Sequence, residues 1–275
     1  MIENTFCHVP GIGATTEQKL WGAGILSWRD FPGAGKPPVA RRKADTLRQH
    51  LERSTERLAA RDAAYFARSL RADQQWRLFS EFQDSVAYLD IETTGLGNPG
   101  DHITTIALYD GLTVRHYIHG QNLADFPGDI AAYSLLVTFN GKTFDVPFIQ
   151  NYFRVELDQA HIDLRYVLAS LGFRGGLKAC EKKLGLDRGE LEGVDGFLAV
   201  LLWRKYRRTG DRRYLDTLLS YNIQDVLNLE VLMALAFNLR LRATPFEATH
   251  RLPVPTPVRN PFEADPEIIR SVVGG

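Results

Sequence analysis

The sequence predicts an α/β protein, a mixed sheet flanked by helices and preceded by a small all-α segment. From Val86 to Phe139, short apolar or alternating runs are separated by turn residues, which is typical of strands. From Phe144 to Asn238, apolar residues instead recur with helical spacing. Strands followed by helices, in a chain of 275 residues, fit one mixed sheet with helices on its faces. The expected division is a helical segment, the α/β domain and a tail, at residues 1–80, 81–240 and 241–275.

The helical segment opens with a glycine-containing turn. Val9-Pro-Gly-Ile-Gly13 precedes a short helical stretch, Thr16–Trp21, and a second glycine-apolar pair, Gly24-Ile25. This order resembles a helix-hairpin-helix DNA-binding element. The backbone N–H groups of Gly11 and Gly13 could point at a phosphate beside a helix N-terminus. A purely packing role for the turn remains an equal alternative.

Residues 40–70 have the pattern of a charged amphipathic helix. Leu47, Leu51 and Leu58 recur on one face, and arginines crowd the other faces. A solvated basic face explains this pattern more readily than a nucleic-acid-binding ridge does.

Four strands are expected in the α/β domain. The first, Val86–Leu89, is a continuous apolar run. The next two, at 103–109 and 114–119, alternate, and Asp110-Gly111 between them is a hairpin turn. The fourth, Leu135–Phe139, is apolar again. Helices are expected after these strands at 144–153, 164–171, 177–185, 194–209 and 212–238.

Two carboxylates lie one residue apart where the first strand ends. Side chains alternate along a strand, so Asp90 and Glu92 point to the same face. Two carboxylates on one face of a central strand repel each other and are costly to bury. A bound cation resolves this conflict, so the pair is read as half of a metal site. A strand end with two solvated acids is the plainer alternative.

Two further acidic positions occur at element boundaries. Asp145 lies where the fourth strand turns into a helix, after a turn that suits Asn140 and Gly141. A helix N-cap is the plainer role for Asp145. Tyr221 and Asp225 are four residues apart on a predicted helix and therefore share a face. Their plainer role is a hydrogen-bonded or surface pair. Asp163, which begins another helix, is read as an N-cap more readily than as a fifth ligand.

Taken in order, these stretches carry a resemblance. Asp-x-Glu on a strand, Asn-x(3)-Phe-Asp and Tyr-x(3)-Asp are similar to the three motifs of the DnaQ-like DEDD exonuclease superfamily, in its DEDDy form. The longer match, with the Pro-Gly-Ile-Gly start, resembles YprB-like ribonuclease H-like proteins of bacteria. It covers roughly residues 5–240. The resemblance implies a ribonuclease H-like sheet and a 3′–5′ exonuclease.

The same resemblance implies roles for individual residues. Asp90, Glu92, Asp145 and Asp225 would ligate metal, and Tyr221 would orient the attacking water. Because all four ligands are carboxylates, two Mg²⁺ or Mn²⁺ ions are expected rather than zinc. The residues expected to contact substrate are Thr93, Leu96, Asn140, Gly141, Lys142 and Phe144.

Charge is balanced overall but unevenly distributed. Residues 1–80 carry 13 Lys and Arg against 8 Asp and Glu, residues 81–173 carry 4 against 12, and residues 174–214 carry 11 against 6. An acidic centre between basic flanks suits a metal site that handles a polyanion. Nine basic side chains could contact phosphates: Lys142, Arg174, Lys178, Lys182, Lys183, Arg204, Lys205, Arg207 and Arg208.

Other general features complete the expectations. Cys7 and Cys180 have no metal-ligand spacing and are expected to be reduced in a cytoplasmic protein. No leader or membrane-spanning run is expected. The proline-rich chain after Phe246 is expected to be extended and poorly ordered.

A nucleic-acid partner is expected, with DNA slightly favoured over RNA and the oligomeric state left open. Besides an exonuclease, a structure-selective endonuclease and a catalytically inactive nucleic-acid-binding module remain alternatives.

Overall fold

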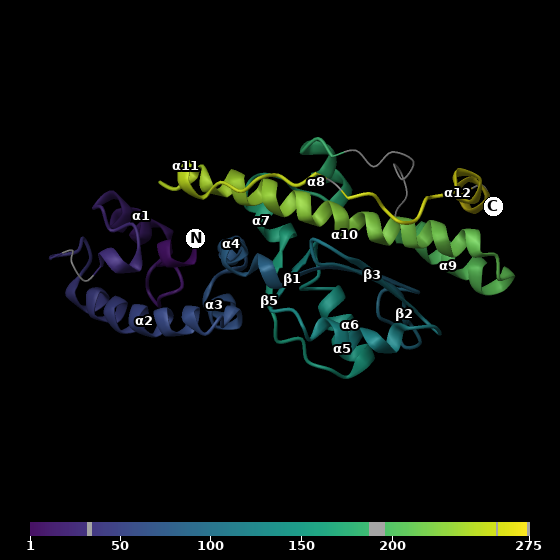
Figure 1. The fold of residues 1–275 in the computed structure, drawn as a ribbon, viewed down its shortest axis with the longest axis horizontal. Helices are drawn as coiled ribbons and strands as arrows, with labels where there is room; N and C mark the ends of the chain where they lie inside the picture. Colours follow the sequence, from purple (N-terminus) through teal and green to yellow (C-terminus); the bar gives the residue numbers. More distant parts are fainter. Residues whose placement is uncertain (32–34, 187–195, 257, 274–275) are drawn as a thin grey trace.

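A five-stranded mixed sheet forms the centre of the protein (Figure 1). The computed structural model describes the whole chain except residues 32–34, 187–195, 257 and 274–275. The strand order is β3-β2-β1-β4-β5. The central strand β1 is antiparallel to β2 and parallel to β4. The strands are β1 Val86–Thr93, β2 Ile103–Tyr109, β3 Val114–Ile118, β4 Leu135–Thr138 and β5 Ala160–Asp163.

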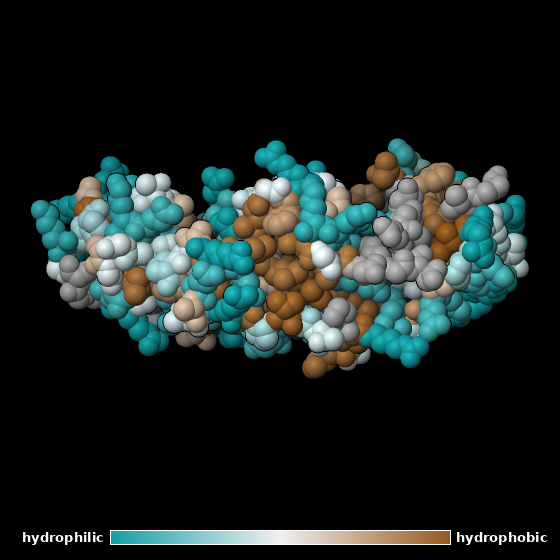
Figure 2. Space-filling view, turned by 90° about the horizontal axis from the view of Figure 1, so that it is seen from above, coloured by the Kyte–Doolittle hydropathy of each residue, from teal (hydrophilic) through white to brown (hydrophobic). Residues whose placement is uncertain are grey.

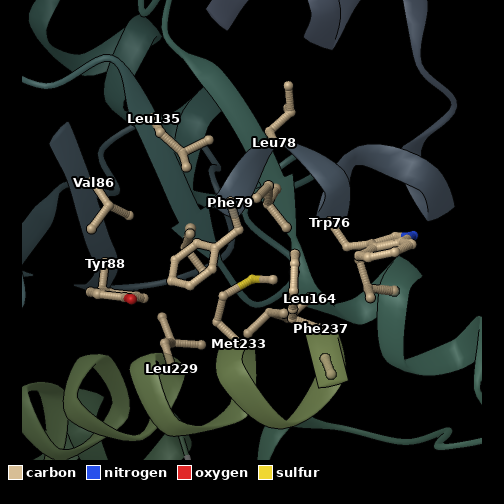
Figure 3. Packing of buried hydrophobic residues seen from close by; sticks show 14 of the residues in the cluster. Trp76, Leu78, Phe79, Val86, Tyr88, Leu135, Leu164, Leu229, Met233 and Phe237 are labelled. Atoms are coloured by element: carbon tan, nitrogen blue, oxygen red, sulfur yellow. The ribbon is translucent and has the colours of Figure 1, made fainter. Parts of the chain in front are cut away.

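Helices cover both faces of this sheet, as the sequence predicted. The odd-numbered side chains Ala87, Leu89 and Ile91 pack with residues of α5 (Phe126–Ile130) and α6 (Asp145–Phe153). The even-numbered side chains of β1 face the opposite layer, which contains the long helix α10. Figure 3 shows part of this second core, where Tyr88 of the sheet faces Leu229 and Met233 of α10. The fold is therefore a ribonuclease H-like α/β fold.

The helices of the second layer and the C-terminal region follow the sheet in the chain. They are α7 Leu164–Ser170, α8 Leu177–Lys183, α9 Gly196–Thr209, α10 Arg212–Leu241, α11 Glu247–His250 and α12 Pro266–Val273. A 3-10 turn, η5 Leu123–Asp125, precedes α5.

Helical elements make up the N-terminal segment, which lies at one end of the molecule (Figure 1). Its core is continuous with the core under α10, because Trp76 packs edge-on against Phe237 at 5.2 Å between ring centroids. Seen from above, this end is largely hydrophilic, and hydrophobic residues gather over the middle of the molecule (Figure 2). The elements are η1 Ile2–Asn4, α1 Ala14–Gly22, η2 Trp28–Asp30, α2 Arg41–Ala59, α3 Ala63–Ser69, η3 Ala72–Leu78, α4 Phe79–Phe82 and η4 Gln83–Ser85.

The expected helix over residues 40–70 is interrupted. Arg61 adopts a left-handed conformation with φ of 57°, which ends the first helix. Asp62 then accepts a hydrogen bond from the N–H of Tyr65 and caps α3. The prediction of one continuous helix is therefore wrong, because a local cap restarts the helix in a new direction.

Two elements of the α/β domain were not predicted. Strand β5 has four residues, and its pairing with β4 rather than its own pattern defines it. Helix α5 has five residues and contains Pro127 and Gly128, which are poor helix formers. The hairpin turn at Asp110-Gly111 is confirmed, since Asp110 Oδ1 accepts hydrogen bonds from the N–H groups of Leu112 and Thr113.

The C-terminal region differs from the expected tail. Its last helix, α12, was not predicted, and the chain before it is attached to α10 by hydrogen bonds. Asn238 exchanges two such bonds with the backbone of Leu252, and Asn260 donates to the carbonyl of Ser220. Arg213 pairs with Asp265 at 2.7 Å. Between α11 and α12 the described residues form no helix or strand, in line with the extended chain that was expected, whereas these bonds and α12 differ from the expected poor order.

Two other expectations concern cysteines and membranes. Both cysteines are free, with Cys7 half-buried and Cys180 buried. Within the part of the chain that the structure describes, no helix combines the length and apolar character that crossing a membrane requires.

Candidate metal centre

Three carboxylates converge where β1 meets α10. Asp90 and Glu92 lie on the face of β1 that packs toward α10, and Asp225 lies on that helix. One oxygen atom from each of the three lies within 4.8 Å of the others. Asp90 and Glu92, predicted to share one face of a strand, thus lie close to Asp225, which follows Glu92 by 133 residues and lies on a helix.

Asp145 reaches this cluster from α6. It is the first residue of that helix, and its Oδ1 accepts a hydrogen bond of 3.2 Å from the N–H of Ile91, between Asp90 and Glu92. The helix has no side-chain N-cap bond, so the N-cap role considered for Asp145 is wrong. The side chain is directed to β1 instead.

Burial and mutual repulsion raise the pKa of these carboxyl groups. Burial is the main cause for Asp90 and Glu92, whose pKa values lie well above the usual range, and the charges of Asp225 and Asp145 add to it. Burial also raises the pKa of Asp145, to about 7. Hydrogen bonds from Asn222 and from the N–H of Ile91 oppose these shifts in part, and a positive charge placed among the carboxylates would favour their ionised forms further.

Asn222 holds Asp90 in place and was not singled out in the sequence. It is fully buried on α10, and its Nδ2 donates to Asp90 Oδ2 at 2.7 Å. Its Oδ1 accepts a hydrogen bond of 3.0 Å from Thr105 on β2. A buried amide three residues before Asp225, on an otherwise apolar face, is the signal that could have identified it.

Tyr221 and Lys178 lie beside the carboxylates. Tyr221 is 5% exposed and one turn before Asp225 on α10. The Nζ atom of Lys178, on α8, lies 4.7 Å from the centroid of the Tyr221 ring. The positive charge of Lys178 also lowers the pKa of Glu92 in part, against the larger effect of burial. The sequence indicated Lys178 only as a general phosphate contact.

Asp163 organises the turn that carries the second motif. Its carboxylate accepts hydrogen bonds from the N–H groups of Asn140 and Lys142 at 2.8 and 3.1 Å. It also accepts from the N–H of Arg165, which confirms its predicted N-cap role. Asn140 is left-handed, with φ of 68°. A Cβ atom at Gly141 would lie 2.3 Å from Thr138 Oγ1, so this close approach requires glycine.

The side chains expected to contact substrate have different surroundings. Leu96 is 86% exposed just beyond β1, and the Thr93 hydroxyl donates to the carbonyl of Gly95 at 2.6 Å. Lys142 is half-buried and donates to Gln75. Phe144 is half-buried beside Phe148.

Gly11 and Gly13 lie in the N-terminal segment. Gly11 is left-handed and Gly13 is the N-cap residue of α1. A Cβ atom would contact nothing within 4 Å at either position. Space is therefore available beside this turn.

A cavity of about 570 Å³ begins at Asn140 and extends between α7 and the start of α8. Arg165 and Arg174 line it together with the rings of Phe139 and Phe173. Arg165 donates a hydrogen bond to the Asn140 side chain. Rings and guanidinium groups thus adjoin the turn that leads to Asp145.

Two known proteins and one protein superfamily are similar to parts of this chain. The family B DNA polymerase of the hyperthermophilic archaeon Pyrobaculum calidifontis is similar over 61% of this chain and 27% of its own, with 17% identity and a TM-score of 0.40, too distant a likeness to indicate function. The uncharacterized protein YprB of Bacillus subtilis (strain 168) is 29% identical over 171 residues, which are 54% of this chain and 40% of YprB. The matched part thus spans less than half of that relative. Residues 87–237, more than half of the chain and all of the carboxylate cluster, match the RNase_H superfamily, and the protein belongs to this superfamily.

Proposed function

We propose that the protein is a metal-dependent nuclease that hydrolyses phosphodiester bonds, acting as a 3′–5′ exonuclease with two divalent cations. One observation carries this proposal: Asp90, Glu92 and Asp225 converge, and Asp145 joins them through its bond to β1. Membership in the RNase_H superfamily supports it.

The donor set fits divalent cations. All four side chains offer carboxylate oxygens, the ligands that Mg²⁺ and Mn²⁺ prefer. Burial first, and then the repulsion between neighbouring carboxylates, raises the pKa values of Asp90, Glu92 and Asp145, and a divalent cation would oppose both effects. Cations bound by Asp90, Glu92, Asp145 and Asp225 would activate the attacking water and stabilise charge on the leaving oxygen.

The protein's own residues then position the reactants. Asn222 keeps the Asp90 carboxylate oriented through its 2.7 Å hydrogen bond. Tyr221 lies one turn from Asp225, and its hydroxyl group would orient the attacking water through a hydrogen bond. This role does not require the tyrosine to ionise. Lys178, beside the Tyr221 ring, adds positive charge near the scissile phosphate.

A substrate strand would lie beside these groups. Leu96, exposed at the end of β1, would contact the last base, together with Thr93. Asn140, Gly141, Lys142 and Phe144 would contact this strand, and the cavity beginning at Asn140 has the rings and arginines that suit a nucleotide. The N–H groups of Gly11 and Gly13 would contribute a separate, sequence-independent phosphate contact, with DNA favoured slightly over RNA as the partner.

A digestion assay tests the proposal. The protein is incubated with Mg²⁺ or Mn²⁺ and labelled single strands of DNA and of RNA, each with a free or a blocked 3′ end. Stepwise shortening only of strands with a free 3′ end is the expected result. Internal cuts would instead identify an endonuclease, and binding without cleavage in either metal would identify an inactive binding module.

A further inference from the structure

A second cavity lies at the end of the sheet where β1 and β3 finish and β2 begins. It has a volume of about 470 Å³ and is bounded by the sheet on one side and α9 on the other. The N–H of Thr94 donates to the carbonyl of His102 at 3.0 Å, so these two residues hold the sheet side together. We call this cavity the α9 pocket, lined by Thr94, His102, His119, Trp203, Arg204, Arg207 and Arg208.

Aromatic rings form much of the α9 pocket. The rings of His102 and His119 lie 4.4 Å apart between centroids, and His119 meets Trp203 edge-on at 6.2 Å. Trp203 is only 3% exposed and so forms the floor. The two histidines are 17 residues apart in sequence and showed no useful spacing, but the start of β2 and the end of β3 bring them together. Rings arranged in this way offer a surface on which a nucleobase can stack.

Positive charge surrounds these rings. Arg204, Arg207 and Arg208 are exposed on one face of α9, and no ion pair is found for them among the residues that the structure describes. The Arg207 guanidinium lies 5.8 Å from the centroid of Trp203. The adjacent acid, Asp101, is engaged elsewhere, because its carboxylate accepts hydrogen bonds from the N–H groups of Gly97 and Asn98.

The arginines supply positive charge to the α9 pocket. Burial, together with the charges of His102 and Arg207, lowers the pKa of His119, which favours its neutral ring. A neutral ring is available for stacking, and the guanidinium groups supply phosphate contacts.

We propose that the α9 pocket binds one nucleotide of the nucleic-acid substrate outside the metal centre, with its phosphate on the arginines and its base on the rings. This inference rests on the proposed nuclease function, because it assigns a second contact to the same strand. Thr94 follows Glu92 by two residues, roughly 7 Å along a strand. The nucleotide in the α9 pocket would therefore be one or two nucleotides away, along the nucleic acid, from the nucleotide at the carboxylates.

A binding experiment without divalent metal tests the pocket separately from cleavage. The dissociation constant of a labelled single strand of about 12 nucleotides, a length within known single-strand site sizes, is measured in EDTA over a range of salt concentrations. The Arg204→Ala, Arg207→Ala double variant is compared with Lys205→Ala, which removes a charge from the same helix but not from the pocket lining.

We expect the double variant to bind about tenfold or more weakly, and its log–log salt dependence to become shallower by roughly 0.7 for each phosphate that it no longer neutralises. Lys205→Ala should change the affinity by less than about twofold, because Lys205, a candidate phosphate contact by sequence, does not line the α9 pocket. His102→Ala should weaken binding about fivefold because a stacking surface is removed, with the salt dependence unchanged. Equal affinities for the double variant, Lys205→Ala and the wild type would overturn the inference, as would the absence of oligonucleotide binding by the wild type.

Failure of this inference is distinguishable from failure of the proposed function. If the wild-type protein binds through the arginines but cleaves nothing with Mg²⁺ or Mn²⁺, the nuclease proposal fails and the binding site remains. If it cleaves strands and the double variant binds normally, the nuclease stands and the α9 pocket does not bind substrate.

Discussion

The buried carboxylate of Glu17 and the carboxylate cluster of Asp90, Glu92, Asp145 and Asp225 have different surroundings. Glu17 in the N-terminal segment is 1% exposed, and its carboxylate accepts bonds from Arg77 at 2.7 Å, from Thr5 and from backbone N–H groups. In the carboxylate cluster, burial raises the pKa values of Asp90 and Glu92, and the charges of Asp225 and Asp145 raise them further.

The difference separates a charge that is paired within the protein from a cluster of charges that suits a bound cation. A buried carboxylate with a guanidinium partner is complete, and removing either member leaves an uncompensated charge. In a cluster of buried carboxylates, mutual repulsion lowers the stability of the fold, and a bound cation would relieve that repulsion. Variants of the two sites should therefore affect opposite properties, stability for Glu17 and activity for the cluster.

The largest effect is expected for Asp90→Asn. Removing this carboxylate should lower the hydrolysis rate by about a thousandfold or more, a loss of roughly 4 kcal/mol of transition-state stabilisation. The metal-free melting temperature should not fall, because the repulsion among the acids decreases. Asp158→Asn, a change at an exposed acid, is the control. Hydrolysis by Asp90→Asn at the wild-type rate would show that the site is assigned incorrectly.

Glu17→Gln tests the other side of the comparison. It leaves Arg77, which is 3% exposed, without its charge partner. The free energy of unfolding, measured with urea, should fall by about 3–5 kcal/mol. Below the melting transition, the metal concentration needed for activity should not change. A shifted metal requirement in this variant would mean that the two sites are not independent.

Asn222→Ala should have an intermediate effect on activity. Without the hydrogen bond to Asp90, the Mg²⁺ concentration for half-maximal activity should rise about 10- to 100-fold. Asn228→Ala is a matched control, because Asn228 is also buried on α10 but donates to Glu181. If both variants need the same metal concentration as the wild type, Asn222 has only a packing role.

The last prediction concerns the pH dependence of stability in the metal-free protein. The pKa of Asp145 is about 7 in the folded protein, against 3.8 ordinarily, so ionisation favours the unfolded chain. In EDTA, stability should therefore decrease as pH rises from about 4 to about 7, and Mg²⁺ or Mn²⁺ should restore it at the upper end. Melting temperatures of wild type and Asp145→Asn provide the measurement. Parallel pH curves for the two proteins in EDTA would exclude this carboxylate as the cause.

The fold class was largely predictable from local patterns. Four of the five strands and the long helix ending near residue 240 have clear periodicity, and the mixed sheet is confirmed. Strand β5 was missed because its four residues, with a histidine among them, depend on pairing with β4. The break at Arg61 was missed because a single left-handed residue leaves the apolar spacing on both sides intact.

The candidate site divides in the same way. The sequence by itself indicated the four carboxylates, Tyr221 and their order as candidates. Strand periodicity places Asp90 and Glu92 on one face, and the resemblance to the DEDD motifs adds Asp145, Tyr221 and Asp225. Only the tertiary structure decided that Asn222 holds Asp90, that Lys178 lies over Tyr221, and that His102 and His119 meet at α9. These contacts join segments far apart in the chain, and sheet pairing and helix packing set their distances rather than any local pattern.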